Sequence, residues 1–112
     1  MSEESLGQQL KEILLRHVGR ERPIKAEALA SLFRYDDDRP IRKAIEMLID
    51  NGFPVCSVTQ DPAGYFFPAD VDEARKYSKS LQQRAVRIFL RRRHIIRNTA
   101  RYYEKVKQGV LL

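Results

Sequence analysis

The chain has 112 residues, of which 43% are hydrophobic and 32% are charged, so we expect one small globular domain with at most an appendage. Its longest apolar runs span only four or five residues, too short to cross a bilayer, and an acidic start without a following apolar stretch argues against a secretory signal. The single cysteine, Cys56, excludes an intrachain disulfide, and we expect a reducing, cytoplasmic setting.

The charges are distributed unevenly along the chain. Lys and Arg number 21 and Asp and Glu number 15, which gives a net charge of +6. Residues 1–72 carry 9 basic and 13 acidic side chains, whereas residues 73–112 carry 12 and 2. This asymmetry is typical of a basic arm that binds a polyanion or of a basic helix that docks on an acidic surface, and composition leaves both open.

Apolar side chains at helical spacing predict a first helix over about residues 5–18. Ser2 or Ser5 is expected to cap its start, and Gly19 is expected to end it. After a polar connection, Ile24 is predicted to form a very short strand or an anchor.

A second, short helix is predicted from residue 25 or 26 to residue 33, with Ala28, Leu29 and Leu32 as its buried positions. Three aspartates then interrupt the pattern before a third helix. Asp38 is expected to be its N-cap, and Pro40 falls in the first turn, where a missing N–H costs nothing. One apolar stripe predicts its buried face: Ile41, Ala44, Ile45, Leu48 and Ile49.

The helix is expected to end at Asn51-Gly52, since glycine suits the left-handed position there. Two β-type runs, residues 55–59 and 65–67, predict a hairpin around the loop between them. Asp70, three residues ahead of Glu73, predicts the start of a last helix, and neither Pro nor Gly follows until about residue 107. Such a helix would be roughly 50 Å long; a break near residues 91–93 is equally allowed.

Residues 24–67, IKAEALASLFRYDDDRPIRKAIEMLIDNGFPVCSVTQDPAGYFF, resemble the small winged helix-turn-helix domains of bacterial and phage regulators and replication proteins. Gly52-Phe53-Pro54 after the third helix and Gly64-Tyr65 at the second strand carry the resemblance. It implies an α+β, mostly α fold, with a winged helix-turn-helix of three helices and a β-hairpin wing over residues 1–69. A long basic C-terminal helix, residues 70–108, and a tail, residues 109–112, would follow.

In such a fold the third helix is the recognition helix, whose N-terminal end meets base edges in the major groove. Arg39, Arg42 and Lys43 lie in its first turn and a half, and arginine fits guanine O6 and N7 with two donors. We expect these three residues to contact DNA, with a solvated surface as the alternative. The preceding aspartates would repel phosphates unless paired, and the hairpin loop holds no Lys or Arg, so this part alone is electrostatically weak.

Arginines recur at three- or four-residue spacing in the C-terminal helix, so several share a face. We expect them to bind phosphates, with docking on an acidic surface or plain solvation as alternatives. The residues are Arg84, Arg87, Arg91, Arg92, Arg93, Arg97 and Arg101.

The same helix carries a heptad-like seam with steps of four and three, interrupted by Arg92 and Thr99. A winged domain of about 70 residues has little surface to cover so long a helix, so we expect a homodimer, with packing on the first helix as the alternative. The predicted dimer seam is Leu81, Ala85, Ile88, Ile95 and Tyr102.

No catalytic, cofactor, metal or small-molecule site is evident. His17 and His94 have no Cys or carboxylate at metal-ligand spacing, Cys56 is expected to be a small buried residue, and the glycines form no phosphate loop. The aspartate triplet is explained more simply by helix capping than by magnesium.

The sequence therefore predicts a non-enzymatic, sequence-specific double-stranded DNA-binding protein without a membrane partner. The resemblance implies a transcriptional regulator or an accessory factor of phage DNA replication, in the cytoplasm of a bacterium or a phage-infected cell. The main alternative is a protein-binding adaptor whose basic helix grips an acidic partner. The third interpretation is an RNA-binding protein, in which the basic helix and exposed tyrosines grip phosphates and bases.

Overall fold

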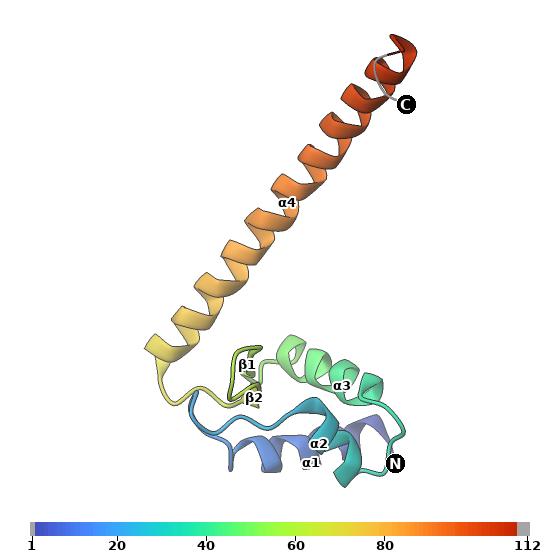
Figure 1. The fold of residues 1–112 in the computed structure, drawn as a ribbon. Helices are drawn as coiled ribbons and strands as arrows, with labels where there is room; N and C mark the ends of the chain where they lie inside the picture. Colours follow the sequence, from blue (N-terminus) through green and yellow to red (C-terminus); the bar gives the residue numbers. More distant parts are fainter. Residues whose placement is uncertain (1, 110–112) are drawn as a thin grey trace. The chain divides into compact units, whose positions relative to one another are not determined.

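The computed structural model describes residues 2–109, in which four helices and one two-stranded antiparallel sheet follow one another (Figure 1). The fold is therefore α+β and mostly helical, as predicted. The predicted tail lies, except for Gly109, outside the described residues. The elements are α1 (Glu3–Leu14), α2 (Ala26–Leu32), α3 (Arg39–Asp50), β1 (Cys56–Val58), β2 (Gly64–Phe66) and α4 (Val71–Lys107).

The chain divides into two compact units, Met1–Tyr77 and Ser78–Leu112. The first contains α1 to β2 and the first two turns of α4, and the second contains the rest of α4. The boundary thus lies inside a helix.

Side-chain caps fix the starts of α1 and α4. The Ser2 hydroxyl accepts a hydrogen bond from the Ser5 amide at 3.1 Å, so of the two predicted caps Ser2 is the one used. At α4, the Asp70 carboxylate accepts from the Glu73 amide at 2.8 Å, and the Glu73 carboxylate accepts from the Ala69 amide at 3.1 Å. This reciprocal arrangement satisfies donors that a helix start leaves unpaired, and it confirms the predicted start.

Helix α1 ends at Leu14, so the prediction that it reaches Val18 is wrong. The backbone after it pairs with the end of the hairpin instead: the Gly19 amide donates to the Phe67 carbonyl at 2.8 Å, and the Phe67 amide donates to the His17 carbonyl at 2.9 Å. Gly19 keeps a positive φ of 95°, but it serves this connection and not the helix end. A pairing across about 50 residues has thus replaced the last turn of the predicted helix.

The predicted hairpin is confirmed, with Cys56 opposite Phe66 and Val58 opposite Gly64. Ile24 pairs with its second strand as an isolated antiparallel bridge, because the amides and carbonyls of Ile24 and Tyr65 exchange two hydrogen bonds of 2.8 Å. Gly64 makes this close approach possible. A Cβ on Gly64 would lie 2.5 Å from the Ile24 carbonyl group, and its φ of +140° also favours glycine.

Helices α1, α2 and α3 and the hairpin enclose one hydrophobic core, in which the largest fully buried side chains are Phe66, Leu10, Leu14, Leu29 and Ile41. From α3, Ile41, Ile45 and Leu48 are buried, as the stripe predicts, whereas Ile49 is half exposed.

Helix α2 buries Ala26, Leu29 and Ala30, so the prediction that Ala28 and Leu32 are buried is wrong. The side chain of Leu32 is 62% exposed. In a helix of seven residues two neighbouring faces have nearly the same apolar content, and packing against α3 selects the face with the two small alanines.

Helix α4 continues from Val71 to Lys107 without the break that the arginine run allowed. Its first turns belong to the unit with the core, where the Tyr77 and Ser57 hydroxyls lie 3.1 Å apart. None of the described residues of α4 is buried. Within residues 2–109, no helix combines the length and the apolar composition needed to cross a membrane.

Candidate nucleic-acid interface

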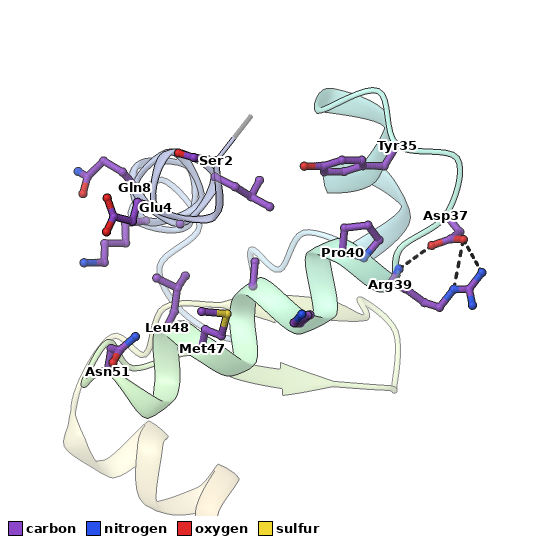
Figure 2. A pocket seen from close by; sticks show the side chains of 15 residues that line it. Ser2, Glu4, Gln8, Tyr35, Asp37, Arg39, Pro40, Met47, Leu48 and Asn51 are labelled. Atoms are coloured by element: carbon purple, nitrogen blue, oxygen red, sulfur yellow. Dashed lines mark hydrogen bonds and ion pairs between the residues drawn. The ribbon is translucent and has the colours of Figure 1, made fainter.

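The first turn of α3 exposes Arg39, and a carboxylate of the preceding turn holds it in place (Figure 2). One oxygen of Asp37 accepts the Arg39 amide at 2.9 Å; the other accepts Arg39 Nη2 at 2.9 Å and Nε at 3.3 Å. These hydrogen bonds lower the pKa of Asp37 and raise that of Arg39. Asp38 is the N-cap residue of α3, as predicted, but its side chain makes no capping hydrogen bond, and the Asp37 carboxylate accepts the Arg39 amide instead.

Asp38 instead pairs with Arg42, one turn along the helix, with Oδ2 and Nη2 2.9 Å apart. The hydrogen bond to Asp38 raises the pKa of Arg42. Two of the three aspartates that were expected to repel phosphates are thus paired with nearby arginines, which partly neutralise their negative charge. Asp36, the third, is exposed.

Arg42 also connects α3 to the hairpin, because its Nη1 lies 3.5 Å from the hydroxyl of Tyr65 on β2. Burial raises the pKa of Tyr65, and the guanidinium of Arg42 partly opposes this shift. Two anchors, the Asp38 carboxylate and the Tyr65 hydroxyl, therefore restrain the Arg42 side chain, which remains 57% exposed.

Lys43, one turn beyond Arg39, lines an open groove between α1 and α3. The groove has a volume of about 940 Å³, and Leu6, Met47 and Leu48 contribute apolar surface to it. Farther along α3 the exposed charges are acidic, Glu46 and Asp50. The cationic part of the helix is therefore confined to its first turn and a half.

Arg20 supplies a cation at the hairpin loop, which has no Lys or Arg of its own. Its Nη1 donates to the Pro62 carbonyl at 2.7 Å, and its Nη2 donates to the Gln60 carbonyl at 3.0 Å. Sequence reasoning missed this residue because it is 40 residues from the loop, and no local pattern relates the two. The hairpin loop is therefore less poor in positive charge than its sequence suggests.

The seven arginines of α4 that were predicted to bind phosphates are all exposed, but helical geometry divides them. Successive residues turn by about 100° around the helix, so Arg84, Arg87 and Arg91 share one face and Arg97 and Arg101 lie beside it. Arg92 falls on the opposite side, between Leu81 and Ala85 in projection, and Arg93 lies between the two faces. The cationic face of α4, defined here as Arg84, Arg87, Arg91, Arg97 and Arg101, is therefore smaller than the full arginine set.

The predicted dimer seam lies on the exposed apolar side of α4. Leu81 is 42% exposed, Ile88 59%, Ile95 57% and Tyr102 53%, and Ala85 is exposed as well. The rings of Tyr102 and Tyr103 contact each other edge to face, with centroids 5.3 Å apart.

Nothing in residues 2–109 gathers three His, Cys, Asp or Glu side chains into a metal-binding cluster. Cys56 is buried, as predicted, and burial raises its thiol pKa to about 11, which keeps it neutral at physiological pH. His17 has a structural partner, the Arg22 carbonyl, 2.9 Å from its Nδ1.

Comparison of the chain with protein-family models, with curated proteins and with solved structures gave no match. The assignment of a function therefore depends on the residues and their geometry.

Proposed function

We propose that this protein binds double-stranded DNA, with the first turn of α3 reading base edges, and that it has no catalytic role. The observation that carries the proposal is the restrained, exposed pair Arg39 and Arg42, each held by a neighbouring aspartate. Both guanidinium groups are exposed at the N-terminal end of α3, the part of a recognition helix that meets base edges.

The order of the elements supports this interpretation. A helix, a bridge residue, two further helices and a hairpin that pairs back to the bridge are what a winged helix-turn-helix would present. In that interpretation α3 enters the major groove and the hairpin is the wing. From the resemblance alone, we extend the proposal to a transcriptional regulator or phage replication factor in the cytoplasm of a bacterium or phage-infected cell.

The ion pairs with Asp37 and Asp38 do not exclude base contacts. Both pairs are at the surface, where solvent screening makes an ion pair weak, so an arginine can exchange its carboxylate for a base edge at little cost. A bidentate contact of arginine with guanine contributes about 1–3 kcal/mol of discrimination between bases. The exchange therefore favours DNA wherever a guanine lies within reach.

Arg20 and the cationic face of α4 would supply contacts with phosphates, which add affinity without sequence information. Six arginines that each neutralise a phosphate would give a log–log salt slope of about −5.4. This term compensates for the net negative charge of residues 1–77, which carry 11 basic and 14 acidic side chains.

The test is selection from a randomised duplex pool at two salt concentrations, followed by sequencing of the retained DNA. We expect a motif that survives the higher salt for the wild-type protein and is weakened at one position for Arg42→Ala. Arg16→Ala is the matched control, since it removes an exposed cation that follows α1 and should leave the motif unchanged.

Three outcomes would contradict the proposal. Salt-sensitive retention without any motif would mean that the arginines hold phosphate unspecifically. Preference for a structured RNA over every duplex would favour the RNA-binding interpretation. No retention even at low salt would favour a protein adaptor with an acidic partner.

A further inference from the structure

Helix α4 exposes more large apolar side chains than is usual for a helix that is surrounded by solvent. Beyond residue 78 none of its described residues is buried, although aliphatic and aromatic side chains gather on one side of it. Contiguous exposed apolar surface of this kind marks an interaction site. These side chains are Leu81, Ile88, Phe89, Ile95, Ile96, Tyr102, Tyr103 and Val106.

Their spacing specifies a helix as the partner. One set repeats every seven residues, and a second set lies four residues after each member of the first. Apolar residues that repeat strictly every seven residues are typical of two helices that supercoil around each other. On a straight helix that packs on a flat surface, the apolar residues would instead repeat every 3.6 residues. The first set is Leu81, Ile88, Ile95 and Tyr102, and the second is Ala85, Arg92, Thr99 and Val106.

We propose that the partner is a second copy of this chain and that the two α4 helices pair antiparallel, centred between Arg93 and His94. A parallel pair would place each seam residue against its own copy. Arg92 would then oppose Arg92 in the centre of the seam, and Tyr102 would oppose Tyr102 while Ala85 left a gap. Like charges at such a position and unequal layers both destabilise the pair.

The antiparallel register reduces both problems, although the two Arg92 side chains then fall in neighbouring layers on either side of the centre. Every member of the first set then meets a member of the second, so in each layer a large apolar residue faces a smaller or a polar one. Arg92 lies opposite Ile95 and no longer opposite another cation. The expected layers are Leu81 with Val106, Ala85 with Tyr102, Ile88 with Thr99, and Arg92 with Ile95.

The residues that flank the seam support the same register. In an antiparallel pair, the residues that come directly after members of the first set face each other across the interface. Phe89, which follows Ile88, would therefore cover Ile96 of the second copy, which follows Ile95. On the other flank Arg91 would face Asn98, which can accept its hydrogen bonds, whereas Arg84 would face Lys105, a like-charge pair that salt screens. The register therefore covers Phe89 and Ile96, the exposed apolar side chains that flank the seam in the middle of the helix, and this complementarity of the chain with itself favours a second copy over an unrelated helix.

Charge sets the conditions under which the pair forms. Residues 78–112 carry 10 basic side chains and 1 acidic one, so two copies repel each other at low salt. Added salt screens this repulsion, and the pair should become tighter as salt rises. Binding to DNA has the opposite salt dependence, which separates the two properties in experiment.

Cysteine substitutions test the orientation. In a Cys56→Ala background, Leu81→Cys and Val106→Cys proteins are mixed in a glutathione redox buffer at high salt. We expect a disulfide between the two variants, because a disulfide needs Cα atoms within about 7 Å and the antiparallel register brings these positions together. Arg87→Cys, on the cationic face, is the control that should not cross-link with either. Cross-linking of Leu81→Cys with itself in preference to the mixed pair would overturn the proposal.

Light scattering tests the pairing without cysteines. We expect a dimeric mass for the wild-type chain that becomes more fully populated as salt rises, and a monomeric mass for Leu81→Ser/Ile88→Ser. The matched control, Val86→Ser/Leu90→Ser, removes two exposed apolar side chains on another side of α4 and should remain dimeric.

A wild-type chain that is monomeric at every salt concentration would overturn the proposal, as would a monomer whose apolar side binds anionic lipid vesicles. The inference does not rest on DNA binding. A monomer that selects a duplex motif would refute only the pairing, and a dimer that binds no duplex would refute only the proposed function.

Discussion

Residues 2–77 bury twelve hydrophobic side chains in a shared core, whereas none of the described residues beyond Tyr77 is buried. The two units also differ in charge, since acidic side chains exceed basic ones in the first and nearly vanish from the second. The first unit is therefore stabilised by its own core. The stability of the helix in the second unit depends on packing against a partner. Substitutions in the first unit should change unfolding, and those in the second should change association.

The largest expected effect separates the two units directly. Leu10→Ala, at a fully buried position of α1, should lower the free energy of unfolding by about 2–5 kcal/mol because it leaves a cavity. Leu81→Ala, at a position 42% exposed, should change the unfolding of the core unit much less. Urea titrations followed by tyrosine fluorescence measure both. Equal losses in the two variants would mean that the units do not differ in this way.

Two glycine substitutions test the close approach of the hairpin to Ile24 within the first unit. Gly64→Ala should cost about 2–4 kcal/mol, because its Cβ would push against the Ile24 carbonyl group and its φ is positive. Gly7→Ala, inside α1, should instead stabilise by about 0.5–1 kcal/mol, since its Cβ meets only the Leu48 side chain at an ordinary 3.6 Å. Thermal unfolding of the two variants should shift in opposite directions, and a harmless Gly64→Ala would contradict the close approach.

The buried thiol of Cys56 gives the core unit a pH dependence that α4 cannot share. Burial favours the neutral thiol in the folded state, with a pKa of about 11 against an ordinary value of 9.0. The resulting stabilisation, up to about 2 kcal/mol, is complete below pH 9 and disappears as the pH rises to about 11. Urea titrations across this range should show the loss in the wild type and a smaller loss in Cys56→Ala.

The smallest expected effect concerns the cation at the hairpin loop. Arg20→Ala removes the donors to the Gln60 and Pro62 carbonyls and should cost about 1 kcal/mol, with faster amide exchange in the loop. The control, Arg22→Ala, removes an exposed cation nearby in the sequence and should leave exchange in that loop unchanged. Equal exchange in both variants would contradict the role given to Arg20.

Local patterns were enough to predict most of the elements. The spacing of Ile41, Ile45 and Leu48 predicted the buried face of α3, and the Asp70 and Glu73 pair predicted the start of α4. Ile24 was expected as a short strand or an anchor and forms a bridge. Each of these features depends on residues a few positions apart, so the sequence alone carries them.

The features that the sequence did not predict depend on distant or competing partners. The end of α1 was placed too late because the Phe67 backbone pairs with His17 and Gly19. The contact of Arg20 with the hairpin loop depends on folding of the whole unit. At α3 the predicted N-cap Asp38 is in place, but its carboxylate pairs with Arg42 while the carboxylate of Asp37 accepts the Arg39 amide, and the sequence did not indicate this division.

The most direct test of whether α3 reads DNA compares Arg42→Ala with Arg91→Ala on a preferred duplex and on its scrambled sequence, at several salt concentrations. Arg42→Ala should cost about 1–3 kcal/mol on the preferred duplex and little on the scrambled one. Arg91→Ala should weaken both alike and reduce the salt slope by about one. If Arg42→Ala leaves the preference unchanged, or if the wild-type chain binds neither duplex at low salt, the account of α3 as the DNA-reading element is contradicted.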